Sequence, residues 1–166
     1  MRKIYVDADA CPVRQEIFEV AKDLGDPVVL VSSVDHMTRR SHPSHVQAVY
    51  VDKGSDSADF KIVSLMEKGD VLVTQDYGLA SLVLHKGRVF HHNGREYLPE
   101  KMDDLLLRRH LSAQARQAGQ RTKGPRKFTH EDRQRFKSRF YDSLCQEPKL
   151  SPKRSEEHTS ELQSQR

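Results

Sequence analysis

The opening of the chain constrains its fold most, because a short apolar run leads directly into two carboxylates. Ile4, Tyr5 and Val6 are β-prone and show no polar alternation, which is typical of a strand buried on both faces of a parallel sheet. Asp7 and Asp9 follow at its carboxyl end, where open α/β sheets bind their ligands. Residues two apart in a strand point the same way, so both carboxylates are expected to face one site. The alternative interpretation is an acidic turn in which Asp9 caps the next helix.

The rest of the chain alternates helix and strand signals, which indicates an α/β fold. Apolar residues recur at helical spacing over residues 13–24, and Gly25 supplies the stop of that helix. This alternation favours right-handed crossovers, and therefore a three-layer architecture with a mainly parallel sheet flanked by helices. The further apolar segments predicted as strands are residues 27–31, 46–51 and 71–74.

The C-terminal third is predicted to add a short hairpin and two helices. Asn93-Gly94 lies between apolar segments, which is a strong hairpin signal, and Pro99 opens a helix that runs to about residue 118. Thr129 and Asp132 resemble a capping box with Asp in place of the usual Glu or Gln, so a last helix is expected there. The apolar residues of this last helix are spaced i, i+4: Phe136, Phe140 and Leu144.

Length and composition favour one cytoplasmic domain. The 166 residues suit a single core over residues 1–150, in which residues 117–128 form a basic loop. No apolar run is as long as a membrane span, and the N-terminus lacks the apolar stretch of a signal peptide. The two cysteines form no paired motif, which indicates a reducing compartment. Residues 151–166 are predicted to be a disordered tail without a role, because residues 154–164 look like a sequencing-adapter oligonucleotide translated in frame.

Charge is distributed unevenly along the chain. Residues 1–107 hold 13 Lys and Arg against 17 Asp and Glu, whereas residues 108–141 hold 11 against 2. An acidic body followed by a basic segment is what a metal site beside a polyanion-binding flank would look like. A solvated basic helix face is the alternative explanation.

Three further acids follow other predicted strands and extend the site begun by Asp7 and Asp9. Asp56 is placed to cap the helix after the third strand, Asp59 shares its helix face, and Asp76 follows the fourth strand. Two like charges about 4 Å apart repel by about 4 kcal/mol at an effective dielectric constant of 20, so clustered carboxylates need protons, basic partners or a divalent cation. Hard oxygen ligands suit Mg²⁺ or Mn²⁺, which typically keep waters and reach substrate phosphates.

These features together support a nuclease hypothesis. A divalent ion can activate water or clamp the oxygens of a phosphodiester, and the basic segment would hold the phosphates of a nucleic acid, in the first place RNA. Asp7, Asp59 and Asp76 are the first choices for metal ligands. Asp9 is a second choice and a further predicted catalytic residue, and Asp56 is a second-choice ligand. The predicted nucleic-acid contacts are Lys61, Arg121, Lys123, Arg126 and Lys127.

Other chemistry-bearing residues are assigned more ordinary places. Cys11 is expected to be a small buried thiol, because the neighbouring carboxylates disfavour its thiolate. His91 and His92 lie on the predicted hairpin and are expected at the surface. Thr74 is a candidate for orienting a ligand, and Phe128 is expected to anchor the basic loop to the core.

Four stretches resemble the signature sequences of the YaiI/YqxD family, a family of small and largely uncharacterised bacterial proteins. They are Val-Asp-Ala-Asp-Ala-Cys-Pro at 6–12, Gly-Ser-Asp-Ser-Ala-Asp-Phe-Lys-Ile at 54–62, Val-Thr-Gln-Asp-Tyr-Gly-Leu-Ala at 73–80 and Gly-Pro-Arg-Lys-Phe-Thr at 124–129. The resemblance spans about residues 2–145 and implies a PIN-like fold, which the family shares with metal-dependent ribonucleases. Carried over residue by residue, it implies an acidic site of Asp7, Asp9, Asp56, Asp59 and Asp76.

Two other functions remain open. A haloacid-dehalogenase-type phosphatase also begins with a strand and Asp-x-Asp, with Asp7 as nucleophile and Asp9 as acid/base. Cys11 stands where that motif prefers Thr or Val, and Asp70 with Asp76 fits its later acidic motif poorly. A non-catalytic RNA-binding module of the same fold is the second alternative.

Overall fold

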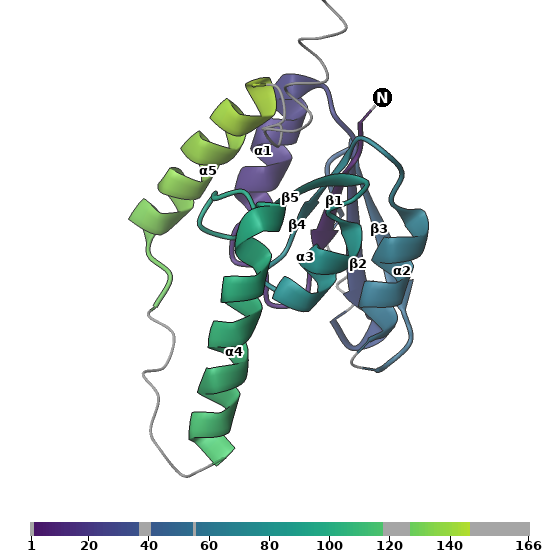
Figure 1. The fold of residues 1–166 in the computed structure, drawn as a ribbon. Coiled ribbons are helices and arrows are strands. Elements are labelled where there is room, and N and C mark those ends of the chain that lie inside the picture. The colour runs from purple at the N-terminus through teal and green to yellow at the C-terminus, as the bar shows by residue number, and fades with distance from the viewer. Residues whose placement is uncertain (1, 37–40, 55, 118–126, 147–166) are drawn as a thin grey trace, which may run out of the picture.

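A five-stranded sheet forms the centre of the computed structural model, which describes residues 2–36, 41–54, 56–117 and 127–146 (Figure 1). The strand order β3-β2-β1-β4-β5 places the strand that carries the first acids in the middle. All pairings between these strands are parallel, as predicted. The strands are β1 (Ile4–Asp7), β2 (Val28–Ser33), β3 (Val46–Val51), β4 (Asp70–Val73) and β5 (Gly87–Phe90).

Helices cover both faces of the sheet and complete the three layers that were expected. Helices α1 and α5 pack together over one face, and α2 and α3 lie over the other (Figure 1). The arrangement is consistent with a PIN-like domain. The helices are α1 (Arg14–Leu24), α2 (Ser57–Leu65), α3 (Tyr77–Val83), α4 (Met102–Gln117) and α5 (His130–Cys145), with short 3-10 turns at Val34–His36 and Pro99–Lys101.

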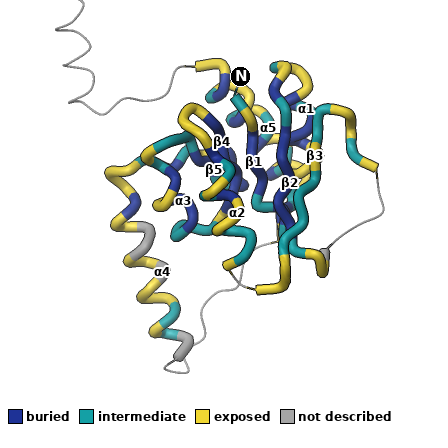
Figure 2. Tube along the Cα trace, turned by 90° about the vertical axis from the view of Figure 1, so that its right-hand side faces the viewer, coloured by how far each residue is buried: buried dark blue, intermediate teal, exposed yellow. Residues whose placement is uncertain are grey.

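The hydrophobic core has two parts, one on each face of the sheet. Because side chains alternate along a strand, β1 contributes to both parts. Ile4 and Val6 pack with α1 and α5, whereas Tyr5 packs with α2 and α3. Figure 2 shows this central strand buried between its neighbours. The apolar run without alternation is therefore explained by a central strand that is covered on both faces.

The last helix closes the α1 side of the sheet with aromatic side chains. The rings of Phe136 and Phe140 stack with their centroids 5.0 Å apart, and Phe140 meets Phe90 edge to face at 5.1 Å. Lys137 of α5 also forms a 3.0 Å ion pair with Glu19 of α1. The i, i+4 pattern predicted for this helix is thereby confirmed.

Local start and stop signals explain several element boundaries. Gly25 ends α1 in the left-handed conformation, with φ at 74°. Thr129 and Asp132 form the predicted capping box of α5. The predicted hairpin is short: after β5, the returning chain makes one isolated antiparallel bridge, between Phe90 and Glu96, within the described residues.

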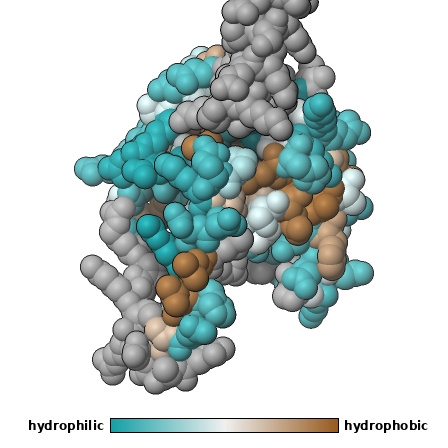
Figure 3. All heavy atoms as spheres, in the orientation of Figure 1, coloured by the Kyte–Doolittle hydropathy of each residue, from teal (hydrophilic) through white to brown (hydrophobic). Residues whose placement is uncertain are grey.

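The surface is largely hydrophilic, with a few large apolar side chains exposed over α2, α3 and α4 (Figure 3). Among the described residues, Phe60 of α2 is the most exposed of these, at 70%. None of the helices described here is both long enough and apolar enough to cross a membrane.

Candidate functional site

The first two acids lie where β1 ends. Asp7 is the last residue of β1 and is half-buried, and because it alternates with Val6 it faces the side of the sheet that α2 and α3 cover. Asp9 accepts a 2.9 Å hydrogen bond from the hydroxyl of Ser32, which belongs to the neighbouring strand β2. The alternative in which Asp9 caps the next helix is wrong, because Val13 occupies the N-cap position of α1.

Thr74 connects Asp7 to the end of β4. Its side chain is completely buried, and its hydroxyl donates a 2.9 Å hydrogen bond to Oδ2 of Asp7. The same hydroxyl oxygen accepts the backbone N–H of Asp76 at 3.0 Å. Thr74 therefore orients the Asp7 carboxylate, and the role in orienting a ligand that the sequence suggested for it stays a prediction.

Asp76 is held at the start of α3. Its Oδ1 atom accepts the backbone N–H groups of Gly78 at 2.9 Å and Leu79 at 3.2 Å, so the side chain is the N-cap of this helix. A carboxylate at this position also suits the positive end of the helix dipole. Capping fixes the orientation of the Asp76 side chain beside the end of β1.

Four carboxylates interact electrostatically at this edge of the sheet. The pKa of Asp7 is raised to about 6, mainly by burial; the charges of Asp59, Asp76 and Asp9 also raise it, and the hydrogen bond from Thr74 lowers it. We call Asp7, Asp9, Asp59 and Asp76 the acidic cluster. The structure thus brings the predicted catalytic residues into one electrostatic neighbourhood from three different βα connections.

The acidic cluster has the donor chemistry of a hard divalent cation site. Carboxylate and hydroxyl oxygens are the ligands that Mg²⁺ and Mn²⁺ prefer, and burial together with the charges of the neighbouring acids raises the pKa of Asp7. Within the ranges that the structure describes, no three His, Cys, Asp or Glu side chains are already arranged to hold a metal ion. The metal ligands therefore stay a prediction.

Asp56 and Lys61 lie on the exposed side of α2. Asp56 occupies the N-cap position as predicted, but its side chain makes no capping hydrogen bond, so the capping role expected for it is wrong. Lys61 is exposed and lines a shallow depression with Phe60 and Tyr50. The metal role of Asp56 and the nucleic-acid role of Lys61 both stay predictions.

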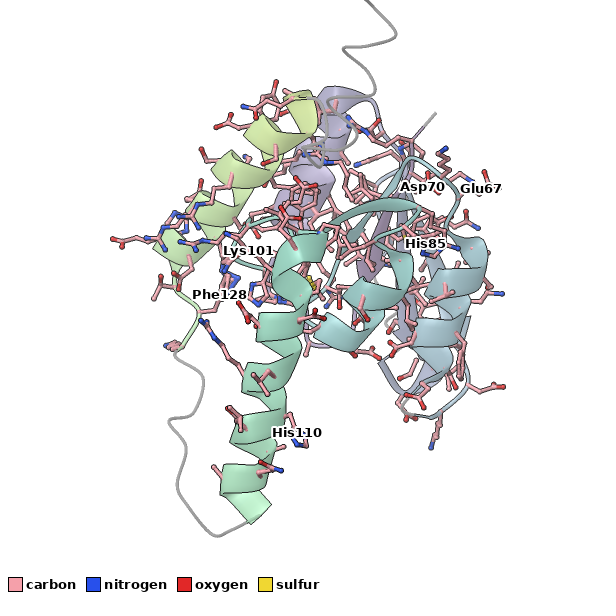
Figure 4. All side chains as sticks on the ribbon, in the orientation of Figure 1. Glu67, Asp70, His85, Lys101, His110 and Phe128 are labelled. Atoms are coloured by element: carbon pink, nitrogen blue, oxygen red, sulfur yellow. The ribbon has the colours of Figure 1, made fainter. Side chains whose placement is uncertain are left out.

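The predicted basic loop lies mostly outside the described residues. Arg121, Lys123 and Arg126 fall in this part, together with the tail predicted for residues 151–166. Lys127 is described and exposed. Phe128 follows it at the base of α5 and packs against the core, which confirms the anchoring role predicted for it (Figure 4).

Asp70 has a structural role at the opposite edge of the sheet. Its carboxylate accepts the backbone N–H groups of Lys3, just before β1, at 3.0 Å and of Glu67, just before β4, at 2.9 Å. Figure 4 shows Asp70 and Glu67 side by side. Asp7 lies at the carboxyl end of the neighbouring strand. Asp70 is therefore removed from Asp7, which disfavours the phosphatase alternative.

The turn after β1 holds an alanine in an unusual backbone conformation. Ala10 has φ at 58°, and it is the only non-glycine residue with positive φ among those described. This left-handed conformation costs about 1–2 kcal/mol for a residue with a side chain. Such strain often accompanies sites of function, and here it lies one residue after Asp9.

Cys11 is buried, as predicted. Burial is the main reason that the pKa of its thiol rises to about 11, and the charges of Asp7 and Glu16 add to the effect. The thiol is therefore protonated near neutral pH, which excludes it as an activated nucleophile.

One prediction about the hairpin is wrong, because His92 is buried rather than at the surface. Its side chain is 3% exposed and lines a pocket of about 360 Å³ beside the β1–α1 turn. Arg135 and Arg139 of α5 line the same pocket. The sequence placed His92 at the surface and did not single out the two arginines, although their i, i+4 spacing next to Phe136 would have pointed to one helix face.

The fold and this edge define an α/β protein with carboxylates gathered at the carboxyl end of a parallel sheet. The sequence model of the uncharacterised bacterial YaiI/YqxD family matches residues 5–146, and the chain belongs to this family.

Relatives in other bacteria cover nearly the whole domain. The chain is 54% identical to the UPF0178 protein of Enterococcus faecalis over 136 residues, which is 81% of this chain and 92% of the relative. It is 50% identical to a UPF0178 protein of Bacillus anthracis over 144 residues, or 86% of this chain and 99% of the relative. No solved structure matches the chain with significance. The comparisons therefore establish a family and leave the activity to be argued from the site.

Proposed function

We propose that this protein is a divalent-metal-dependent nuclease that hydrolyses phosphodiester bonds in RNA. The observation that carries the proposal is the electrostatic coupling of Asp7 to Asp59, Asp76 and Asp9 at the carboxyl edge of the sheet. In open α/β sheets this edge is where ligands bind. Gathering four carboxylates there is unfavourable unless a cation offsets their repulsion.

We assign Asp7, Asp59 and Asp76 as the first-choice ligands of Mg²⁺ or Mn²⁺, with Asp9 and Asp56 as second choices. Such an ion, when bound, supplies an activated water and neutralises charge on a phosphodiester. The hydroxyl of Thr74 keeps the Asp7 carboxylate in one orientation. Mg²⁺ usually keeps several waters, so two or three carboxylates suffice for a site that substrate oxygens complete.

The substrate assignment depends on the charge of the C-terminal part of the chain. Residues 108–141 hold 11 Lys and Arg against 2 Asp and Glu, and Lys127 of this segment is exposed. Contacts between basic side chains and phosphates provide affinity that depends on salt and shows no sequence preference. We therefore assign the contacts with the RNA backbone to five residues: Lys61, Arg121, Lys123, Arg126 and Lys127. We propose that the protein acts in the cytoplasm.

The test compares metal binding and RNA cleavage in the full chain and three variants. Asp7→Asn and Asp76→Asn each remove a ligand charge, and Asn retains the side-chain oxygen that caps α3 at position 76. Asp23→Asn is the matched control, because Asp23 is exposed in the last turn of α1. Calorimetry measures the binding of Mn²⁺ and Mg²⁺, and a labelled single-stranded RNA with and without EDTA reports cleavage.

The proposal expects metal binding and divalent-dependent cleavage in the parent and in Asp23→Asn, and the loss of both in the two site variants. Circular dichroism must show that the site variants are folded. RNA binding without divalent-dependent cleavage, unchanged by Asp7→Asn, would identify the protein as a non-catalytic RNA-binding module instead. A phosphoaspartyl intermediate trapped on Asp7 would establish phosphatase chemistry and overturn the proposal.

A further inference from the structure

A second site lies beside the acidic cluster, in the pocket of about 360 Å³ that contains His92. Its walls come from the β1–α1 turn, the β4–α3 turn, the loop after β5, and α5 with Phe128 just before it. We call it the His92 pocket and define it by Ala10, Gln75, His92, Asn93, Arg135 and Arg139. Ala10 follows Asp9 and Gln75 precedes Asp76, so the pocket adjoins the acidic cluster through two of its turns.

One residue that lines this pocket has a buried polar atom without a hydrogen-bond partner. Nε2 of His92 makes no hydrogen bond, and the His92 side chain is 3% exposed. Burial is the main reason that its pKa falls to about 4, so the imidazole is neutral near neutral pH. Buried polar atoms in folded proteins almost always have a hydrogen-bond partner, so an orphaned one calls for a ligand or an ordered water.

Two guanidinium groups give the pocket a positive charge. Arg135 and Arg139 are one helical turn apart on α5 and both line the pocket. Arg135 donates to Oδ1 of Asp132 at 3.1 Å, and Arg139 donates to the carbonyl of Asn93 at 3.0 Å. These bonds hold the arginines in place, and each guanidinium has five N–H donors, more than these contacts use. Two arginines outnumber the single carboxylate of Asp132 on the wall.

We propose that the His92 pocket binds a phosphate group of a nucleotide, with Arg135 and Arg139 facing the phosphate and Nε2 of His92 bonded to the same nucleotide. Guanidinium groups match phosphate oxygens in geometry and in charge. A pocket of this volume exceeds the size of one phosphate and lies within the range of small-ligand sites, so part of the sugar or base would enter with it. Its identification as a subsite for the RNA strand rests on the proposed function.

The neighbouring surface favours a strand over a free nucleotide. A wider depression of about 800 Å³ shares His91, Asn93 and Arg139 with the His92 pocket and continues between the loop after β5, α4 and α5. Its lining adds three basic residues, Arg95, Lys101 and Arg108, and three acids, Glu96, Asp104 and Asp142. Figure 4 labels Lys101, just before α4. A chain of nucleotides that occupied the pocket would have room to continue along this depression.

The experiment measures the affinity of a short labelled oligoribonucleotide by fluorescence anisotropy, with EDTA present so that no cleavage occurs. The variants are Arg135→Gln and His92→Leu, and Lys68→Gln is the matched control because Lys68 is exposed at the amino end of β4. The proposal expects each pocket variant to weaken binding about tenfold, since each removes a hydrogen bond to a charged or buried group. The control is expected to bind like the parent.

Competition by a nucleoside monophosphate and by inorganic phosphate identifies what the pocket recognises. Displacement by the monophosphate at lower concentration than by inorganic phosphate supports a nucleotide site, and equal displacement by both reduces the recognised group to the phosphate alone. Affinity that neither Arg135→Gln nor His92→Leu changes would overturn the proposal. Arg139→Gln replaces Arg135→Gln if that variant does not fold.

The outcome is separable from that of the proposed function. Pocket variants that lose affinity while the parent shows no metal-dependent cleavage would leave the pocket assignment standing and remove the nuclease proposal. If the parent cleaves RNA and the pocket variants bind and cleave it equally well, the nuclease proposal stands and the pocket assignment is removed.

Discussion

The hydroxyl of Thr74 lies 2.9 Å from Oδ2 of Asp7, and through it the ends of two neighbouring strands hold one carboxylate. The same hydroxyl oxygen accepts the backbone N–H of Asp76 at 3.0 Å. A single buried side chain therefore fixes the positions of two acids from separate βα connections. The geometry of the acidic cluster depends on this contact, which makes Thr74 a sensitive position for a test.

Thr74→Val is expected to destabilise the protein by about 1–3 kcal/mol, because it leaves the backbone N–H of Asp76 without its acceptor. It also removes the hydrogen bond that lowers the pKa of Asp7, so that pKa should rise further. Thr74→Ser keeps the hydroxyl and should preserve both properties. Urea denaturation and NMR titration of the Asp7 carboxyl measure the two effects, and a Val variant equal to the Ser variant in both would contradict this role.

The stability of the protein should depend on pH through Asp7. Its pKa rises from the ordinary 3.8 to about 6 on folding, so the folded state holds this proton more tightly than the unfolded chain. Stability contributed by the protonated carboxyl is therefore present at low pH and is lost as pH rises from about 4 to about 6. Asp7→Asn should stabilise the protein by roughly 2 kcal/mol at pH 7. This is less than the free energy that corresponds to the full pKa shift, because the carboxylate is partly solvated.

The difference between the parent and Asp7→Asn isolates this effect from other titrating groups. Burial lowers the pKa of His92, which makes acid destabilising in both proteins alike. Unfolding free energies should differ most at pH 7 and converge as the pH falls to about 4. A variant that is less stable than the parent at pH 7 would show that the Asp7 charge is compensated within the protein.

Ala10→Gly is expected to stabilise the protein by about 0.5–1 kcal/mol. Ala10 has φ at 58°, where a side chain is strained and glycine is not. The gain is smaller than the strain because glycine loses more backbone entropy on folding. Thermal unfolding of the two proteins measures it, and a lower melting temperature for the glycine variant would mean that the alanine methyl group makes contacts worth more than the strain.

The two cysteines should differ strongly in reactivity. Cys11 is buried with a thiol whose pKa is raised to about 11, whereas Cys145 is exposed at the end of α5. A thiol reagent at neutral pH should label Cys145 quickly and Cys11 only after denaturation. In Cys145→Ser the fast reaction should disappear. Rapid labelling of that variant in its native state would indicate that the β1–α1 turn opens.

Much of the fold followed from local patterns. The apolar run at Ile4–Asp7 predicted a strand buried on both faces, and Gly25 and the capping box at Thr129 marked helix boundaries that the structure confirms. These signals depend on backbone conformation and on burial over a few neighbouring residues. Asp56 failed as a capping side chain because the N-cap position does not by itself provide the hydrogen bond.

The carboxylates that end successive strands could be named from the sequence, because parallel strands direct their carboxyl ends to one edge. Their division into roles came from three-dimensional contacts. Asp76 caps α3, Asp9 accepts from Ser32, and Asp7 is the acid whose pKa rises, since it ends the central strand among the others. A linear pattern contains no information on which acid is desolvated.

Order along the chain thus determined the class of fold, the family and the acids at the sheet edge, since these depend on residue type and short-range spacing. Only the tertiary structure brought His92 next to Arg135 and Arg139, more than 40 residues further along the chain. His92 was expected at the surface because it lies on the predicted hairpin. It is buried where α5 packs against that loop: Arg139 of α5 donates a hydrogen bond to the carbonyl of Asn93, and Gly94 lies against Phe136 and Arg139. No local pattern points to this long-range contact.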